Sequence, residues 1–199
     1  KNIAALLHPS ISADPIDQEV RKAIEVLIGE DRLREGDNGY GLQSPDQKDW
    51  EQTRRAIDMK PGDAVRLRRE LIKDAVGSIT ITKGRTFKIE LTAELEKGSQ
   101  GDIRLDIREE NDMDALRTIS RTPDAHGQIF WAYDTSEETW DALAELHRSN
   151  EMIARHDTAG QTDAQRILVL EERKRRDRST RNANQLLTGD LTSGTIIFN

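Results

Sequence analysis

The first part of the chain has apolar side chains at helical spacing, followed by a turn signal. Between residues 14 and 29 apolar residues recur every three or four positions, and Asp14-Pro15 supplies an N-cap followed by proline. Segment 33–42 contains Asn38-Gly39, which favours a β-hairpin because a type I′ turn needs positive φ at both central residues. A helix followed by a small hairpin predicts the second half of a winged helix-turn-helix.

Two further helices are predicted before residue 78. The segment Ser-Pro-Asp-Gln at 44–47 is a capping box with proline at the first helical position, so a helix begins there and runs to about residue 59. Pro61 and Gly62 interrupt it. Asp63 is expected to cap the second helix, which ends near residue 77.

The pattern then changes to a period of two. Between residues 79 and 107 apolar and polar side chains alternate, which is typical of strands with one buried face. Lys83-Gly84-Arg85 is expected to form a hairpin turn, and the segment 98–101 separates a third strand at 103–107. We therefore predict a three-stranded β-meander in this part of the chain.

A short helix at 113–120, a strand at 129–133 and two longer helices complete the chain. The first long helix begins after the cap Ser136, and the second is expected over 163–187. The second contains no apolar residue between Glu171 and Asn182. A helix that is polar all round bridges between domains, is held by ion pairs, or is unstable alone.

These patterns together predict an α+β fold. It consists of a partial winged helix, then helices and a small, mainly antiparallel sheet, with a long charged C-terminal helix. Two domains are expected: a winged-helix portion with a linking helix (1–60), and an α/β unit with the meander and the long helix (61–199). Because the chain begins with Lys1 and its last residues form a strand-like run, we expect a piece of a longer protein, truncated at its C-terminus.

Composition and motifs exclude several classes of function. The chain has 34% charged residues, 35% hydrophobic residues and no cysteine, which excludes disulfides, thiolate zinc sites and cysteine nucleophiles. No apolar run reaches the roughly 18 residues of a membrane span. No Gly-Lys-Ser/Thr phosphate loop and no Gly-x-Ser-x-Gly elbow occurs. His147 and His156 lie nine positions apart, which is the wrong spacing for two ligands on one helix face. We predict no catalytic, cofactor or metal site, and therefore no enzyme.

Charge indicates where the chain binds. The net charge is −7, but residues 160–199 carry 7 basic and 5 acidic side chains, a net charge of +2. The basic run Arg173–Arg181 has three possible roles. It is a stripe that contacts phosphates, a solvated helix with Glu171–Arg175 and Glu172–Arg176 pairs, or a surface for an acidic protein partner. The interspersed acidic residues favour the solvated helix. The candidate nucleic-acid or partner contacts are Arg173, Lys174, Arg175, Arg176, Arg178 and Arg181.

The winged-helix portion invites a DNA-binding hypothesis, since such motifs place a helix in the major groove. The helix that would enter the groove carries Asp17, Glu19 and Glu25 against Arg21 and Lys22. Surfaces that enter a groove are normally much more basic. This argues against direct DNA reading by the helix and favours a packing module inside a larger assembly.

The order of segments resembles a known family. The hairpin at 33–42 precedes Gln-Ser-Pro-Asp-Gln-Lys-Asp-Trp-Glu at 43–51, and the strand Ile-Phe-Trp-Ala-Tyr-Asp at 129–134 precedes a long charged helix ending in Leu-Leu-Thr-Gly at 186–189. Over most of its length the chain is similar to the central region of the large P-loop ATPase of BREX phage-defence systems (BrxC or PglY type). The Walker motifs of that family lie outside this region, so ATP and Mg²⁺ belong to the suspected parent.

The resemblance implies a bacterial, cytoplasmic protein that oligomerises and works with a DNA methyltransferase and other BREX components. The leading hypothesis is a non-catalytic scaffold and protein-interaction region of such an ATPase. The alternative is a DNA-binding module, with the winged helix and the basic helix, of the same machine or of a regulator.

Overall fold

The computed structural model describes residues 17–30, 32–36, 39–76, 80–83, 85–97, 100–158 and 160–198. The expected N-cap at Asp14-Pro15, and Asn38 and Gly84 of the expected turns, lie outside these residues. The chain forms two compact units, which divide between Thr53 and Arg54. The sequence-based boundary after residue 60 lies a few residues further along the chain.

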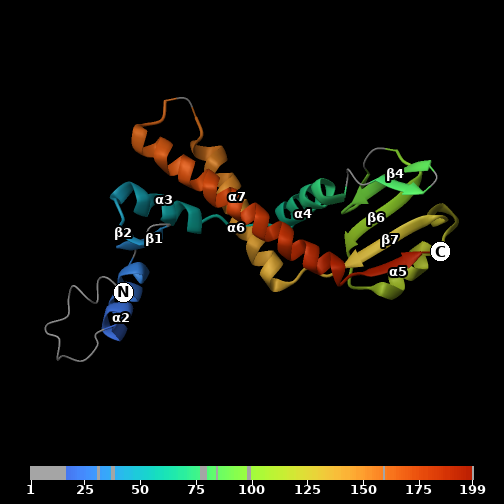
Figure 1. The fold of residues 1–199 in the computed structure, drawn as a ribbon, viewed down its shortest axis with the longest axis horizontal. Coiled ribbons are helices and arrows are strands. Elements are labelled where there is room, and N and C mark those ends of the chain that lie inside the picture. Colours follow the sequence, from blue (N-terminus) through green and yellow to red (C-terminus); the bar gives the residue numbers. More distant parts are fainter. Residues whose placement is uncertain are drawn as a thin grey trace. The chain divides into compact units, whose positions relative to one another are not determined.

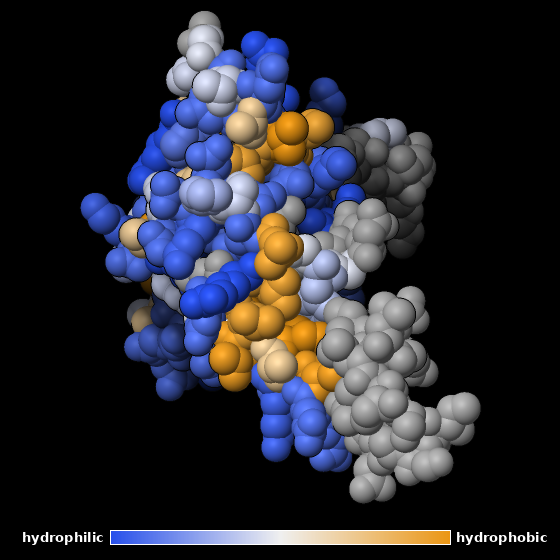
Figure 2. All heavy atoms as spheres, turned by 90° about the vertical axis from the view of Figure 1, so that its left-hand side faces the viewer, coloured by the Kyte–Doolittle hydropathy of each residue, from blue (hydrophilic) through white to orange (hydrophobic). Residues whose placement is uncertain are grey.

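The first unit contains a helix and a two-stranded hairpin. α2 (Asp17–Gly29) is followed by β1 (Leu33–Gly36) and β2 (Gly39–Leu42), which pair antiparallel. The pairing reaches Gly36 of β1 and Gly39 of β2, and Gly39 has a positive φ of 111° at the start of its strand. Apolar surface gathers over α2 and the hairpin (Figure 2), where Val26 is 57% exposed.

The next two helices begin at prolines. α3 (Pro45–Arg55) has the predicted capping box: the Gln47 N–H donates to Ser44 Oγ (3.3 Å), and the Ser44 N–H donates to Gln47 Oε1 (3.0 Å). α3 ends before residue 59. α4 (Pro61–Val76) begins two residues before the predicted cap, because proline suits the first helical position. Asp63 instead sits in the first turn and accepts the Lys60 N–H at 3.2 Å.

The sheet of the second unit is mixed, so the predicted meander is wrong in its third strand. The strand order is β3-β4-β6-β7-β8, with β5 also on β4. β3 and β4 form the predicted antiparallel hairpin, but β4, β6 and β7 run parallel to one another. The strands are β3 (Thr80–Lys83), β4 (Arg85–Ala93), β5 (Glu96–Lys97), β6 (Ile103–Glu109), β7 (Gln128–Tyr133) and β8 (Thr195–Phe198).

The connection after β4 is the physical reason for the parallel strand. Glu94 and Leu95, both with positive φ, turn the chain into β5, which pairs back onto the end of β4. The Asp102 N–H then bonds to the Lys88 carbonyl at 2.8 Å, so β6 starts beside the first half of β4. Gly101 permits this approach, since a Cβ there would lie 2.4 Å from a backbone nitrogen of β4.

Helices cover both faces of the sheet (Figure 1), and the chain is a mixed α/β protein. α5 (Met113–Ser120) and the short 3₁₀ turn Pro123–Ala125 connect β6 to β7 and cover one face around Phe130. α4, α6 (Glu137–His156) and the C-terminal part of α7 (Asp163–Thr192) cover the other. The core on that face consists of Leu67, Leu71, Ile72, Val76, Leu91, Ala93, Leu105, Ile107, Tyr133, Ala142, Leu143, Leu146, Ala183, Leu187 and Leu191.

α6 and α7 pack side by side as a helical hairpin (Figure 1). Ser136 caps α6 as predicted, and Thr162 and Gln165 form a capping box at the start of α7. α7 is continuous through its polar centre and extends to Thr192, beyond the predicted end at residue 187. At about 1.5 Å per residue, its 30 residues span about 45 Å. Its last turns are held by Leu191, whose carbonyl accepts the Trp131 indole N–H at 2.9 Å.

Candidate functional site

The six candidate cations all lie on the central turns of α7. Arg173, Lys174, Arg178 and Arg181 are exposed, whereas Arg175 and Arg176 are half-buried. Because successive residues of a helix are rotated by about 100°, Lys174, Arg178 and Arg181 share one side of the helix. The structure therefore brings three of the six together on one outward side and distributes the others around it.

Three of these cations have acidic partners close by. Arg173 pairs with Asp157, at the end of α6, and Arg175 pairs with Glu172 (3.5 Å). Arg176 pairs with Asp177 at 2.9 Å rather than with Glu172, so the predicted Glu172–Arg176 pair is wrong. The reason is that the Glu172 side chain points away from solvent. Within the described ranges, Lys174 and Arg181 form no ion pair.

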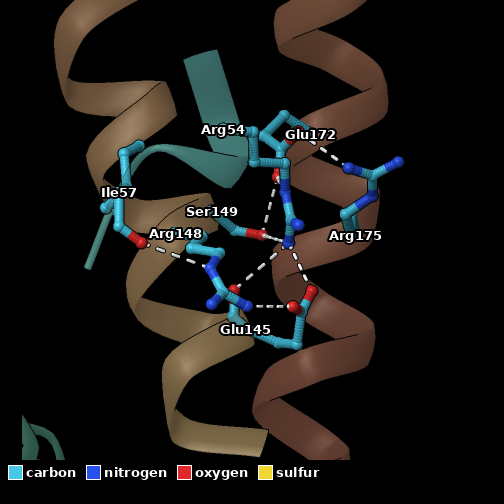
Figure 3. A network of polar contacts seen from close by, with 7 residues as sticks. All are labelled: Arg54, Ile57, Glu145, Arg148, Ser149, Glu172 and Arg175. Atoms are coloured by element: carbon cyan, nitrogen blue, oxygen red, sulfur yellow. Dashed lines mark hydrogen bonds and ion pairs between the residues drawn. The ribbon is translucent and has the colours of Figure 1, made fainter. Parts of the chain in front are cut away.

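The inward side of the same turns holds a buried polar network that the sequence did not predict (Figure 3). Glu172 is 2% exposed, and its Oε1 accepts hydrogen bonds from Arg54 Nε at 3.1 Å and from Ser149 Oγ at 2.7 Å. Arg54, in the last turn of α3, is 6% exposed and also donates from Nη2 to Glu145 Oε2 at 2.7 Å. One arginine is therefore bonded to both helices of the hairpin.

This network explains how a helix without central apolar residues is held. Burying an ion pair costs desolvation, which good geometry and additional hydrogen bonds offset. Arg148 extends the network by donating from Nε to the Ile57 carbonyl at 3.3 Å and by pairing with Glu145. Burial raises the pKa of Glu145, but hydrogen bonds and charge from Arg54 and Arg148 outweigh it and hold this pKa below its ordinary value. Of the three possibilities for a polar helix, ion pairing is the one found here.

A second buried cluster lies at the carboxyl ends of the parallel strands. Glu94 follows β4, Glu109 ends β6 and Tyr133 ends β7, and Arg68 of α4 points at them. Arg68 Nη2 lies 2.6 Å from Glu109 Oε2, and the Tyr133 hydroxyl lies 2.5 Å from Glu94 Oε1. Burial and the Glu94 charge raise the pKa of Tyr133 far above its ordinary value. Ligands of open α/β sheets bind at this edge. Here the bonds from Arg68 Nη2 to Glu109 and from Tyr133 to Glu94 join α4 to the sheet, and Arg68 Nε and Nη1 have no hydrogen-bond partner among the described residues.

The outward side of α7 also carries apolar residues. The first turns of α7 contain four consecutive apolar residues, 167–170, of which only Leu168 and Val169 are buried. Ile167 and Leu170 are 58% and 56% exposed. A smaller apolar patch is visible over the first turns of α7 (Figure 2). An open hollow of about 300 Å³ adjoins it, lined by Asp157, Gln161, Arg166, Val169, Leu170 and Arg173.

The described residues also bear on metal binding and on membrane insertion. Among the described residues, no group of three or more histidine, cysteine, aspartate or glutamate side chains is placed to hold a metal ion. His147 is buried, with its Nε2 3.9 Å from Asp63 Oδ2. No helix in the described part of the chain combines the length and the apolarity needed to cross a bilayer.

The chain matches no protein-family model, no curated protein and no solved structure.

Proposed function

We propose that this chain is a non-catalytic scaffold and protein-interaction region of a large bacterial P-loop ATPase of the BREX type. The observation that carries the proposal is the two-sided character of α7. Its inward side is fixed by Arg54, Ser149 and the sheet core, and its outward side presents cations and apolar side chains to solvent. A rigid, pre-ordered helix loses little conformational entropy when a partner docks on it.

Other parts of the proposal rest on the order of segments. The first unit, with α2 followed by the β1–β2 hairpin, is proposed to be the winged-helix portion. ATP and Mg²⁺ are proposed to bind in the parent ATPase, outside this stretch of chain. The proposed setting is the cytoplasm, the proposed assembly is a homo-oligomer of the parent, and the proposed partners are the BREX components, including the DNA methyltransferase.

Pairwise co-purification tests this proposal. The chain is co-expressed with each BREX component encoded beside its gene, one component at a time, and complexes are measured by size-exclusion chromatography with light scattering. We expect at least one stable complex and no ATP hydrolysis by the chain alone. The proposal is overturned if no component binds, or if the purified chain hydrolyses ATP at a rate that follows its own elution peak.

DNA binding is the second candidate function. It is favoured by Lys174, Arg178 and Arg181, which recur at i, i+4 and i+7 on one side of α7. A labelled duplex should then bind tightly at low salt and weakly at physiological salt. Charge reversal of Lys174, Arg178 and Arg181 should reduce the affinity and flatten its salt dependence. Absence of binding at low salt, where charges are least screened, excludes this candidate.

A further inference from the structure

The outward side of α7 is divided along its length into two zones of different chemistry. Its first turns carry the exposed Ile167 and Leu170, and its next turns carry the exposed Lys174, Arg178 and Arg181. At about 1.5 Å per residue, the distance along the helix from Ile167 to Arg181 is about 21 Å. We refer to these five residues as the α7 stripe.

Two cations of the basic zone, Lys174 and Arg181, can pair with a ligand charge. Lys174 and Arg181 are exposed and have no ion pair with any residue in the described ranges. Asp177, which lies between them in the sequence, is paired with Arg176 at 2.9 Å, so its charge is largely offset. The chain as a whole is acidic, with a net charge of −7. A positive zone in an acidic protein favours a negatively charged ligand at this position.

The apolar zone decides which kind of anion fits. Phosphate backbones are recognised by cations and polar groups, and they leave exposed isoleucine and leucine side chains in water. A protein segment with both carboxylates and apolar side chains covers both zones at once. Interfaces also gain most of their affinity from buried apolar anchors, while charges at the rim direct association. The hollow beside Leu170 gives such an anchor a place to enter.

We propose that the α7 stripe binds an acidic amphipathic helix of a partner protein. Two apolar side chains at one end of that helix pack on Ile167 and Leu170, and carboxylates along its remaining turns face Lys174, Arg178 and Arg181. About 14 residues, or four turns, are needed to span the stripe. This inference rests on the proposed function, because it gives the chemistry of the partner that the scaffold holds.

Designed peptides test the inference on the full chain. The probe is a fluorescent 18-residue helical peptide with two leucines on one face near one end and glutamates on the same face along the rest. Two control peptides replace the leucines with serine or the glutamates with lysine. Affinity is measured by fluorescence anisotropy, in parallel with a labelled 20-base-pair DNA duplex.

Surface variants assign the binding to the stripe. I167S/L170S removes the apolar zone and K174E/R181E reverses the basic zone, and both sites are exposed, so the fold is retained. K97E/R121E is the matched control, because it makes the same charge change at two exposed residues outside α7. We expect each stripe variant to weaken binding of the probe at least tenfold and the matched control to change it less than twofold. Both control peptides should bind at least tenfold more weakly than the probe.

Other outcomes overturn the inference. These are equal binding of the probe to wild type and both stripe variants, no binding of the probe at all, or DNA binding that falls with K174E/R181E but not with I167S/L170S. Co-purification with BREX components separates this failure from failure of the proposed function. A chain that still forms a complex after both stripe substitutions keeps its scaffold role and loses only the proposed docking surface.

Discussion

Charged side chains are buried and paired on the inward side of α7 and exposed to water on its outward side. Glu172 on the inward side is 2% exposed and bonded to Arg54 and Ser149. Lys174, two positions later on the outward side, is exposed. The two belong to one uninterrupted polar stretch of sequence. Charge that is buried and paired fixes the helix, whereas charge left in water is available to a partner, so burial decides the role of each residue.

Breaking the buried Arg54–Glu172 pair is expected to have the largest effect on the free energy of unfolding. Arg54→Ala removes the cation bonded to Oε1 of the buried Glu172 and leaves this carboxylate the longer 3.5 Å pair with Arg175. Removing one partner of a buried ion pair typically costs about 3–5 kcal/mol. The free energy of unfolding, measured by urea denaturation, should fall by that amount. Arg173→Ala, at an exposed arginine of α7, is the matched control and should cost less than about 1 kcal/mol. A loss below 1 kcal/mol for Arg54→Ala would show that the network does not hold the helix. The double variant R54M/E172M should retain more stability than Arg54→Ala, since apolar residues replace both charges.

Removing apolar packing at the end of α7 is expected to have the second-largest effect on the free energy of unfolding. Leu187 is 2% exposed and lies in the core between the helices and the sheet. Leu187→Ala should lower the free energy of unfolding by about 3 kcal/mol, through lost burial and the cavity left behind. Leu170→Ala, at an exposed leucine of the same helix, should change it by less than about 0.5 kcal/mol. Equal losses for the two leucines would contradict the assignment of an inward and an outward side.

Acid should weaken the network through Glu145. The pKa of this carboxyl is lowered in the folded state, so near pH 4 the unfolded chain binds more protons at this position. The Glu145 carboxylate therefore contributes fully to the free energy of unfolding above the pKa of glutamate in the unfolded chain, about 4.3. This contribution is lost as the pH falls through the lower pKa of the folded state. Because Glu145 is partly exposed, the effect is expected below about 1 kcal/mol. The stability difference between wild type and Glu145→Gln, measured by urea midpoints at pH 7 and pH 3.5, should shrink in acid. A constant difference would argue against the pairing.

Neutralising the outward cations should have the smallest effect on stability. Lys174 and Arg181 are exposed, so K174A/R181A is expected to change the free energy of unfolding by less than about 0.5 kcal/mol. Thermal unfolding followed by circular dichroism measures this directly. A loss above 1 kcal/mol would mean that these residues stabilise the fold, and the contrast with Arg54 would disappear.

Local signals in the sequence predicted most elements correctly. The capping residues Ser44 and Ser136 marked two helix starts, and the short helix at 113–120 was predicted with its observed bounds. Such signals succeed because caps and apolar periodicity act over three or four residues. The start of α4 at Pro61 lies two positions before the predicted cap Asp63, because proline and aspartate both favour a helix start.

Strand direction was not readable from the sequence. β6 alternates apolar and polar residues in the same way whether it runs parallel or antiparallel to β4. The direction was decided by the turn at Glu94 and Leu95 and by the close approach of Gly101 to β4. Gly101 was visible only as part of a glycine-rich segment, since its role depends on a backbone that it meets in space.

Neighbouring residues were enough to predict the helices and most of the strands, and to identify the basic run Arg173–Arg181. The burial of Glu172 and the exposure of Lys174 depend instead on which elements pack against α7. The partner of Glu172 is Arg54, 118 positions away, and no periodicity connects the two. The outward stripe was likewise hidden, because the sequence gives the spacing of side chains on a helix but not the side that other elements cover.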